Sequence, residues 1–219
     1  MHLQAGDVFA CYGTDRAGRL IRAWTTLPPP LAPRGLRAGI SHVAIAAPDP
    51  RGQMAWWEST SLGDRKCLVQ GRVVRGVQVH DPEARMADYI RAGGKVVIYR
   101  LVEIDQLTSI EQHNLFVMLR GYVKRRTSYD FAGAAISGLQ ICSLIRWLKV
   151  ADDDELFCSE LIAAVLQRLC RMNRENPARF HPARLLRTLV RQGTYRREHT
   201  IERLEQIEVA DVIPFGHCA

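Results

Sequence analysis

The stretch ISHVAIAAP, residues 40–48, has the composition of a buried strand but carries a histidine inside it. His42 is followed by Val43, Ala44 and Ile45, and small or β-branched side chains of this kind suit a buried, pleated surface. A titratable ring in such a strand is either a hydrogen-bonded part of the core or a group that takes part in chemistry. Taken by itself, the stretch favours the first interpretation.

The residues after this strand predict a hairpin. PDPRGQ (48–53) has the composition of a turn, and MAWWEST (54–60) has that of a second strand. The hairpin puts His42 and Glu58 on adjacent strands, and Trp56 and Glu58 share a face because they are two residues apart. Whether His42 shares that face depends on the register of the two strands. A buried carboxylate is costly without a partner, and a histidine is a suitable one.

The rest of the chain predicts strands in the first half and helices in the second. Outside the hairpin, strands are expected at 5–13, in two short pieces within 67–79 and at 95–102, with an extended element at 197–209. Helices are expected at 15–27, 82–92, 109–126, 129–148, within 152–172 after an acidic loop, and at 181–190, with a proline-rich loop at 28–35. This order predicts an α+β fold, in which an antiparallel sheet or partial barrel packs against a helical layer. We expect residues 1–219 to form a single domain.

The composition is that of an ordinary globular protein. Of the 219 residues, 47% are hydrophobic and 24% are charged, which is enough to form a core without covalent cross-links. No apolar run reaches the roughly 18 residues of a membrane-spanning helix, and the N-terminus lacks the pattern of a secretory signal, so we expect a cytoplasmic protein. In that compartment the six cysteines would stay reduced, and the lack of a C-x-x-C pair argues against a zinc knuckle or a redox motif.

The chain is basic, with 30 Lys and Arg residues against 23 Asp and Glu residues and a net charge of +7. Arginines at helical spacing predict a basic face, formed by Arg184, Arg187 and Arg191 and extended by Arg168, Arg171 and Arg174. Such a face permits weak contact with an anionic surface, so binding to a nucleic acid or an anionic membrane is an alternative function. The sequence has no nucleic-acid-binding motif, and no specific nucleic-acid partner is predicted.

ELFCSELI, residues 155–162, places Cys158 where an acidic stretch turns into a helix. The first turn of a helix has unpaired N–H groups and a partial positive charge, which stabilise a thiolate and can bind an oxyanion. The carboxylates of residues 152–155 oppose this effect. A cysteine nucleophile also needs a base, usually a histidine oriented by a third polar group. On this segment alone, a small apolar residue at the start of a buried helix is the better interpretation.

Four motifs, in order along the chain, resemble one family. They are AGDVF (5–9), SHVAIA (41–46), WWEST (56–60) and FCSELI (157–162). Together they resemble the circularly permuted branch of the NlpC/p60-type papain-like cysteine hydrolases, the YiiX- and YaeF-like branch, in which the histidine strand precedes the cysteine helix. YDF (129–131) and HPARLL (181–186) extend the resemblance over most of the chain.

The resemblance implies a papain-like fold with a catalytic triad. Cys158 would be the nucleophile, His42 the general base and Glu58 the residue that orients the base. A peptidase or amidase of this kind attacks an amide or ester carbonyl with a thiolate and passes through an acyl-enzyme, and it needs no metal or other cofactor. The implied substrates are peptides, cell-wall peptides or lipid-linked amides and esters, and the apolar stretch at 23–36 slightly favours an apolar one. The oligomeric state is left open.

Other residues are alternatives for parts of this site. Asp49 or His80 could orient the base in place of Glu58, and Tyr129 could supply a hydroxyl beside the nucleophile. Cys142 is the rival nucleophile, although its position in the middle of an apolar helix favours packing.

Three further interpretations concern Glu160, a possible zinc site and a role without catalysis. Glu160 is expected to be structural, because a carboxylate in the first turn interacts well with the helix dipole. A zinc site made of His42, Glu58 and Cys158 is conceivable from the ligand types, although the spacing matches no zinc motif. A non-catalytic binding module on the same fold is the remaining alternative.

Overall fold

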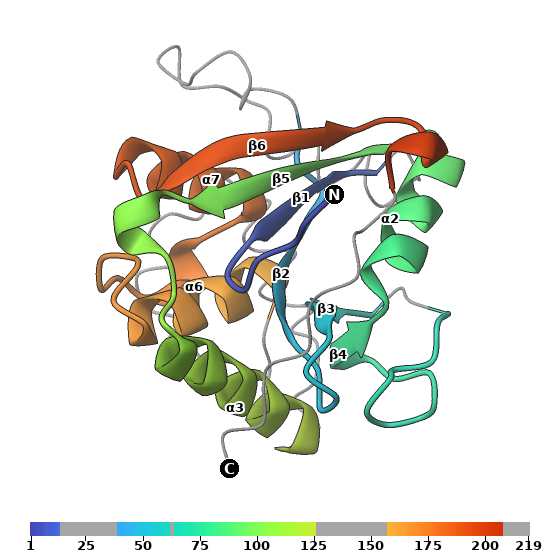
Figure 1. Cartoon of the computed structure of the whole chain (residues 1–219), viewed down its shortest axis with the longest axis horizontal. Coiled ribbons are helices and arrows are strands. Elements are labelled where there is room, and N and C mark those ends of the chain that lie inside the picture. Colours follow the sequence, from blue (N-terminus) through green and yellow to red (C-terminus); the bar gives the residue numbers. More distant parts are fainter. Residues whose placement is uncertain (14–38, 62–63, 126–156, 208–219) are drawn as a thin grey trace.

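The computed structural model describes residues 1–13, 39–61, 64–125 and 157–207 (Figure 1). In these residues, six strands form one antiparallel sheet in the order β4-β3-β2-β1-β5-β6. The strands are β1 (Val8–Tyr12), β2 (His42–Pro48), β3 (Met54–Thr60), β4 (Gly76–His80), β5 (Lys95–Leu101) and β6 (Tyr195–Ile201). The helices are α2 (Pro82–Arg91), α3 (Ser109–Arg125), α6 (Cys158–Arg168) and α7 (Pro182–Arg191), with short 3-10 helices η2 (Glu103–Asp105), η4 (Pro177–Arg179) and η5 (Leu204–Gln206). The predicted α+β class and antiparallel sheet are confirmed.

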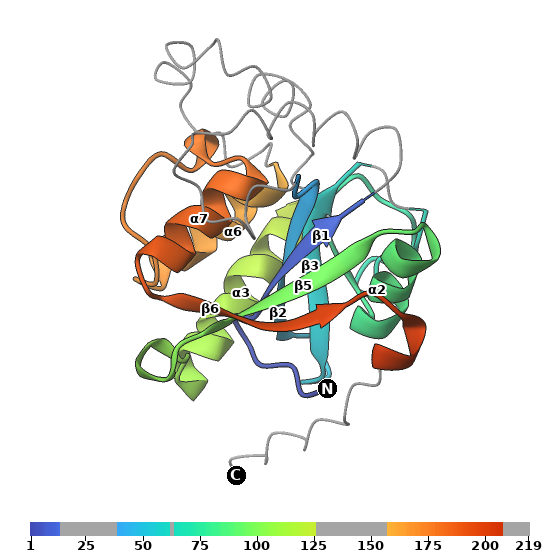
Figure 2. The same ribbon diagram turned by 90° about the horizontal axis from the view of Figure 1, so that it is seen from above.

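Helices cover both faces of the sheet (Figure 2). Helices α3, α6 and α7 lie on one face, where their apolar side chains pack against residues such as Val43 and Ile45 of β2. Helix α2 lies on the other face, and its Met86 packs in a second core cluster with Ala44 and Trp56. Successive residues of a strand point to opposite faces, so His42 lies on the same side as Ala44 and faces the layer of α2. The sequence predicted one helical layer, and the structure has a second layer, formed by α2, on the other face of the sheet.

Most predicted elements are found close to their expected bounds. The hairpin of β2 and β3 is confirmed, as are α2, β5, α3, α6 and α7. One expectation was wrong. Only β4 forms in the described part of the segment 67–79, because Cys67 and Gly71 join in a tight turn through the Gly71 N–H to Cys67 carbonyl bond of 2.8 Å. The expected extended element is confirmed as strand β6, which begins two residues earlier than expected and pairs with β5 after the helices.

Several expectations fall on other parts of the chain. The helices at 15–27 and 129–148, the loop at 28–35, the acidic residues 152–155, and the candidates Tyr129 and Cys142 lie outside the described residues.

Helix α2 begins and ends where local chemistry predicts. The Asp81 side chain accepts a hydrogen bond of 2.7 Å from the Ala84 N–H, and Pro82 occupies the first turn, where its missing N–H costs nothing. After the helix, a Cβ on Gly94 would lie 2.5 Å from the carbonyl oxygen of Tyr12, so only glycine allows this close approach to the end of β1. This turn joins α2 to β5 and places the end of α2 beside the end of β1, close to the start of β2.

Candidate active site

Two adjacent strands bring His42 and Glu58 together on one face of the sheet. Ala46 pairs with Trp56 across β2 and β3, so the even-numbered residues of both strands share the face toward α2. The His42 Nε2–H donates to Glu58 Oε2 at 2.8 Å. The register that the sequence left open therefore joins the two residues, and a histidine is indeed the partner of the buried carboxylate.

Glu58 is fully buried and holds several other donors. The Trp56 Nε1–H donates to its Oε2 at 2.9 Å, and the Arg85 Nε–H donates to its Oε1 at 2.8 Å. His80 Nε2 lies 3.6 Å from Oε1. Burial raises the pKa of Glu58, but Arg85, His42 and His80 outweigh burial and hold the pKa well below its usual range. Glu58 is therefore an ionised carboxylate in the interior.

Cys158 is the first residue of α6 and is fully buried. Phe157 before it has an extended backbone, and its N–H donates to Glu160 Oε2 at 2.8 Å, so Glu160 has the structural role expected of it. The hydroxyl of Ser159 donates to the carbonyl oxygen of Phe180 and anchors the start of α6 to the segment before α7. Cys158 thus stands in the first turn of α6, where the partial positive charge of the helix dipole favours a thiolate or an oxyanion.

His42 interacts with Cys158 as well as with Glu58. Burial lowers the pKa of His42, but the charge of Cys158, a hydrogen bond with the Cys158 side chain, and the hydrogen bond and charge of Glu58 together raise it to about 9. Since Nε2 is engaged by Glu58, the other ring nitrogen, Nδ1, is the one left for Cys158. The structure therefore brings together Cys158, His42 and Glu58, although they are far apart in the sequence.

Helix α2 adds two side chains that the sequence did not point to. Arg85 lies with its guanidinium carbon 5.0 Å from the centroid of the Tyr89 ring. The Tyr89 ring in turn stacks on His42 at 6.5 Å and on Trp56 at 6.2 Å between centroids. No local motif marks these residues, although their spacing of four places them on one helix face.

Cys11 is a third residue that the sequence did not single out. It pairs with His42 across β1 and β2, so its side chain borders the histidine. Burial raises the pKa of its thiol well above the usual range, with a further increase from the charge of Glu58. Cys11 is therefore a neutral packing residue at the edge of the site.

The two alternative residues for orienting His42, Asp49 and His80, do not contact its ring in the structure. Asp49 caps the hairpin turn through bonds of 2.7 Å to the Arg51 N–H and 3.0 Å to the Gln53 N–H, so it does not orient His42. His80 lies beside Glu58, closer to the site than its sequence position suggested, but Glu58 stands between it and His42.

Three of the six arginines of the predicted basic face are engaged in local contacts. Arg184 pairs with Glu175 at 3.0 Å, Arg171 pairs with Glu111 at 2.9 Å, and Arg168 donates to the hydroxyl of Tyr122. Such pairing reduces the positive charge offered to an anionic surface.

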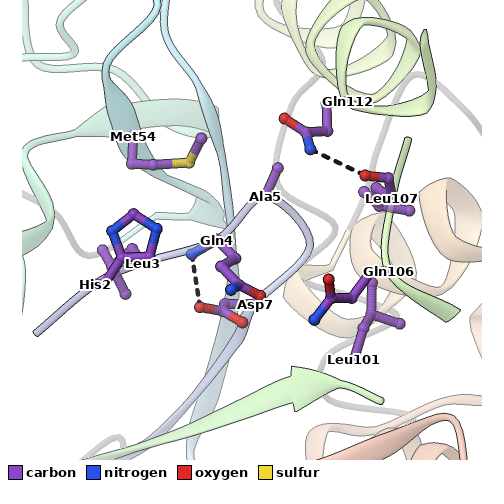
Figure 3. A pocket seen from close by; sticks show the side chains of 10 residues that line it. All are labelled: His2, Leu3, Gln4, Ala5, Asp7, Met54, Leu101, Gln106, Leu107 and Gln112. Carbon is purple, nitrogen blue, oxygen red and sulfur yellow. Dashed lines mark hydrogen bonds between the residues drawn. The ribbon is translucent and has the colours of Figure 1, made fainter. Parts of the chain in front are cut away.

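A separate cavity of about 250 Å³ lies at the opposite end of the sheet (Figure 3). It is bordered by the start of β3 at Met54 and the end of β5 at Leu101, whereas the His42 site lies at the start of β2 and the end of β3. Asp7, from the AGDVF motif, lines it and is held by Gln4 N–H at 2.9 Å and by Arg100 Nη2 at 2.8 Å. This part of the motif is structural.

The described residues have a YiiX-like α+β fold. A solved structure that shows this is metalloprotein YiiX from Escherichia coli O157:H7, a DUF1105 protein, to which the chain is similar with 17% identity and a TM-score of 0.50. The match covers 78% of this chain and 69% of that chain. No protein-family model matches the sequence, and neither does any curated protein. None of the helices in the described ranges has the length and apolar character needed to cross a bilayer.

The description of that YiiX as a metalloprotein raises the question of whether the residues here suit a metal ion. Across residues 1–13, 39–61, 64–125 and 157–207, no three His, Cys, Asp or Glu side chains are grouped to hold one. Both oxygens of Glu58 already accept from N–H donors, and one donor is the permanently charged Arg85. A metal cation beside that guanidinium is unfavourable. The described residues therefore do not fit a metal ion, and the zinc alternative at His42, Glu58 and Cys158 is not supported.

Proposed function

We propose that this protein is a papain-like cysteine hydrolase of the permuted NlpC/p60 type, which cleaves an amide or ester bond. The observation that carries the proposal is the position of His42, hydrogen-bonded to Glu58 through Nε2 and interacting with Cys158 at the start of α6. A nucleophile that contacts a base, which is in turn oriented by a carboxylate, is the arrangement of an acyl-transfer site.

The reaction begins with proton transfer from the Cys158 thiol to His42. The thiolate attacks the carbonyl carbon of the substrate, and the negative charge that develops on the carbonyl oxygen is stabilised by N–H groups in the first turn of α6. His42 then gives its proton to the leaving amine or alcohol, and a thioester to Cys158 remains. His42 next takes a proton from water, and the resulting hydroxide attacks the thioester. The Cys158 thiolate is expelled, the acid leaves, and His42 returns its proton to the thiolate.

Glu58 keeps His42 suited to both steps. Its carboxylate accepts from Nε2–H and stabilises the imidazolium, so that Nδ1 exchanges the proton with Cys158. The substrate class follows from the family resemblance: a peptide, a cell-wall peptide, or a lipid-linked amide or ester.

The test is the detection of the acyl-enzyme. The full chain is incubated with acetyl and longer-chain acyl p-nitrophenyl esters, quenched with acid and examined by intact and peptide mass spectrometry. We expect one acyl group on the Cys158 peptide, labile to hydroxylamine as a thioester is. Cys158→Ser and His42→Ala should lose it, whereas His113→Ala, which removes an exposed histidine of α3, should retain it. Acylation that is spread over lysines and several cysteines would contradict the proposal.

A further inference from the structure

The charge on Glu58 has to be balanced at every stage of the reaction. This argument rests on the proposed function, in which His42 alternates between an imidazolium and a neutral ring. While His42 carries a proton, it is a counter-ion for Glu58 at 2.8 Å. After it gives the proton to the leaving group, the carboxylate of Glu58 is still fully buried. A buried charge without a partner is strongly unfavourable, so a second cation is required.

Arg85 is placed to be that cation. Its Nε lies 2.8 Å from Glu58 Oε1 and its Nη2 lies 3.4 Å from Oε2, and its side chain is only 13% exposed. A guanidinium stays protonated at every working pH, unlike the ring of His42. Arg85 therefore balances Glu58 whether or not His42 carries its proton.

The surroundings hold Arg85 in this position. Its guanidinium lies over the Tyr89 ring at 5.0 Å, and its Nη1 is 3.8 Å from Asp88 Oδ2. Asp88 is fixed from the other side by Arg65, whose Nη2 donates to Oδ1 at 2.6 Å. The residues Arg85, Asp88 and Tyr89 lie three and four positions apart, so α2 presents them together.

The remaining titratable groups around the pair do not replace Arg85. They come from each element packed against it: Cys11 from β1, His80 from β4, Tyr89 from α2 and Cys158 from α6. Burial lowers the pKa of His80, and its Nε2–H already donates to Gln78 Oε1 at 3.0 Å, so unlike Arg85 it is not a permanent cation. Burial raises the pKa of Cys11 and of Tyr89, which keeps both uncharged.

We propose that Arg85 is a positioning residue, which keeps Glu58 ionised after His42 has released its proton and thereby holds the proton of neutral His42 on Nε2, with Nδ1 toward Cys158. Without Arg85, the carboxyl group would take up a proton when His42 loses one. A protonated Glu58 can donate to the ring as well as accept from it, so the preference for one tautomer would be lost.

The test uses NMR on the full chain carrying Cys158→Ala, which removes the thiol and all chemistry. Labelled glutamate and histidine report the ionisation of Glu58 and the tautomer of His42 as the pH is raised. With Arg85 present, we expect the carboxyl signal of Glu58 to stay that of a carboxylate while His42 titrates, and neutral His42 to be protonated on Nε2. Uptake of a proton by Glu58 as His42 loses one would overturn the proposal, and this measurement needs no change at Arg85.

Matched variants in the same background complete the test. Arg85→Met should raise the pKa of Glu58 by about 1–3 units, as loss of an adjacent opposite charge does, and should give a mixture of His42 tautomers. Arg85→Lys should restore both readouts. Arg91→Met is the control, because Arg91 is a largely exposed arginine on the same helix that reaches Asp88 but not Glu58. Equal behaviour of Arg85→Met and Arg91→Met would overturn the proposal. Because these readouts need neither substrate nor thiol, failure of the hydrolase proposal is recognised separately, by the absence of an acyl group on Cys158.

Discussion

His42 and Glu58 are sixteen residues apart in the sequence, and their side chains meet at 2.8 Å across the hairpin of β2 and β3. This relationship explains both unusual residues of the hairpin. The carboxylate is tolerated in the core because His42, Trp56 and Arg85 all donate to it. The histidine is tolerated because Glu58 and Cys158 stabilise its charged form.

The first prediction separates stability from reactivity at Glu58. Glu58→Gln removes the counter-ion of both His42 and Arg85, and leaving one charge of a buried pair unpaired costs about 3–5 kcal/mol of unfolding free energy. Adding Arg85→Met should recover part of that loss in chemical denaturation. The double variant should nevertheless label at Cys158 at least about tenfold more slowly than the wild type at acidic pH, one pKa unit being a tenfold change in the charged form. Labelling as fast as that of the wild type would exclude the role of Glu58.

The two adjacent tryptophans provide a second, matched prediction. Trp56→Phe removes a donor to the charged Glu58, which is worth about 1.5–3 kcal/mol, whereas Trp57→Phe removes a bond to the neutral carbonyl of Ala47, worth about 0.5–1.5 kcal/mol. Both changes remove the same indole group from a fully buried site. Urea unfolding should therefore show the larger loss for Trp56→Phe. Equal losses would mean that Glu58 does not carry the charge assigned to it.

The pH dependence of stability follows from His42. Its pKa in the folded protein, about 9, lies above its ordinary value of 6.5, so the folded state binds the proton more tightly than the unfolded state. This contribution to the free energy of unfolding is complete below about pH 6.5 and is lost as the pH rises through about 9. The stability difference between wild type and His42→Ala should shrink over that range. In a Cys158→Ala background, the loss should occur at lower pH, because the interactions of Cys158 raise the pKa of His42.

Two glycines test the packing that places α2 near the site. Gly94→Ala would put a Cβ 2.5 Å from the Tyr12 carbonyl oxygen, and we expect a loss of about 1–3 kcal/mol, as for other overpacked sites. Gly121→Ala in α3 meets no atom within 4 Å and should stabilise the protein by up to about 1 kcal/mol through helix propensity. Thermal unfolding distinguishes the two, and a neutral Gly94→Ala would contradict the close approach of this turn to β1.

The sequence predicted the elements whose patterns are local. The turn composition at 48–53 and the strand-like composition of 54–60 indicated the hairpin, and Asp81 with Pro82 indicated the start of α2. Strand β6 was harder to predict, because five of its seven residues face solvent at least partly and its pairing with β5 is set by the fold.

The parts of the site that depend on packing were not predictable. Trp56 and Glu58 share a face by spacing alone, but the place of His42 on that face required the register. Arg85 lies on α2, 27 positions after Glu58 and with β4 between them, and no motif relates the two residues. Cys11 borders His42 only because β1 lies beside β2, an order that local patterns do not encode.

The most direct test of the central claim is the rate of iodoacetamide labelling at Cys158, followed by peptide mass spectrometry at about pH 5.5, where an unassisted thiol is almost entirely protonated. Cys158 is fully buried, so the decisive comparison is made at that one residue among wild type, His42→Ala and the control His113→Ala. The account predicts labelling of Cys158 that is fast in wild type and in His113→Ala and slower by at least about tenfold in His42→Ala. Labelling of Cys158 at the same rate with and without His42, or no labelling of Cys158 in the wild type, would contradict it.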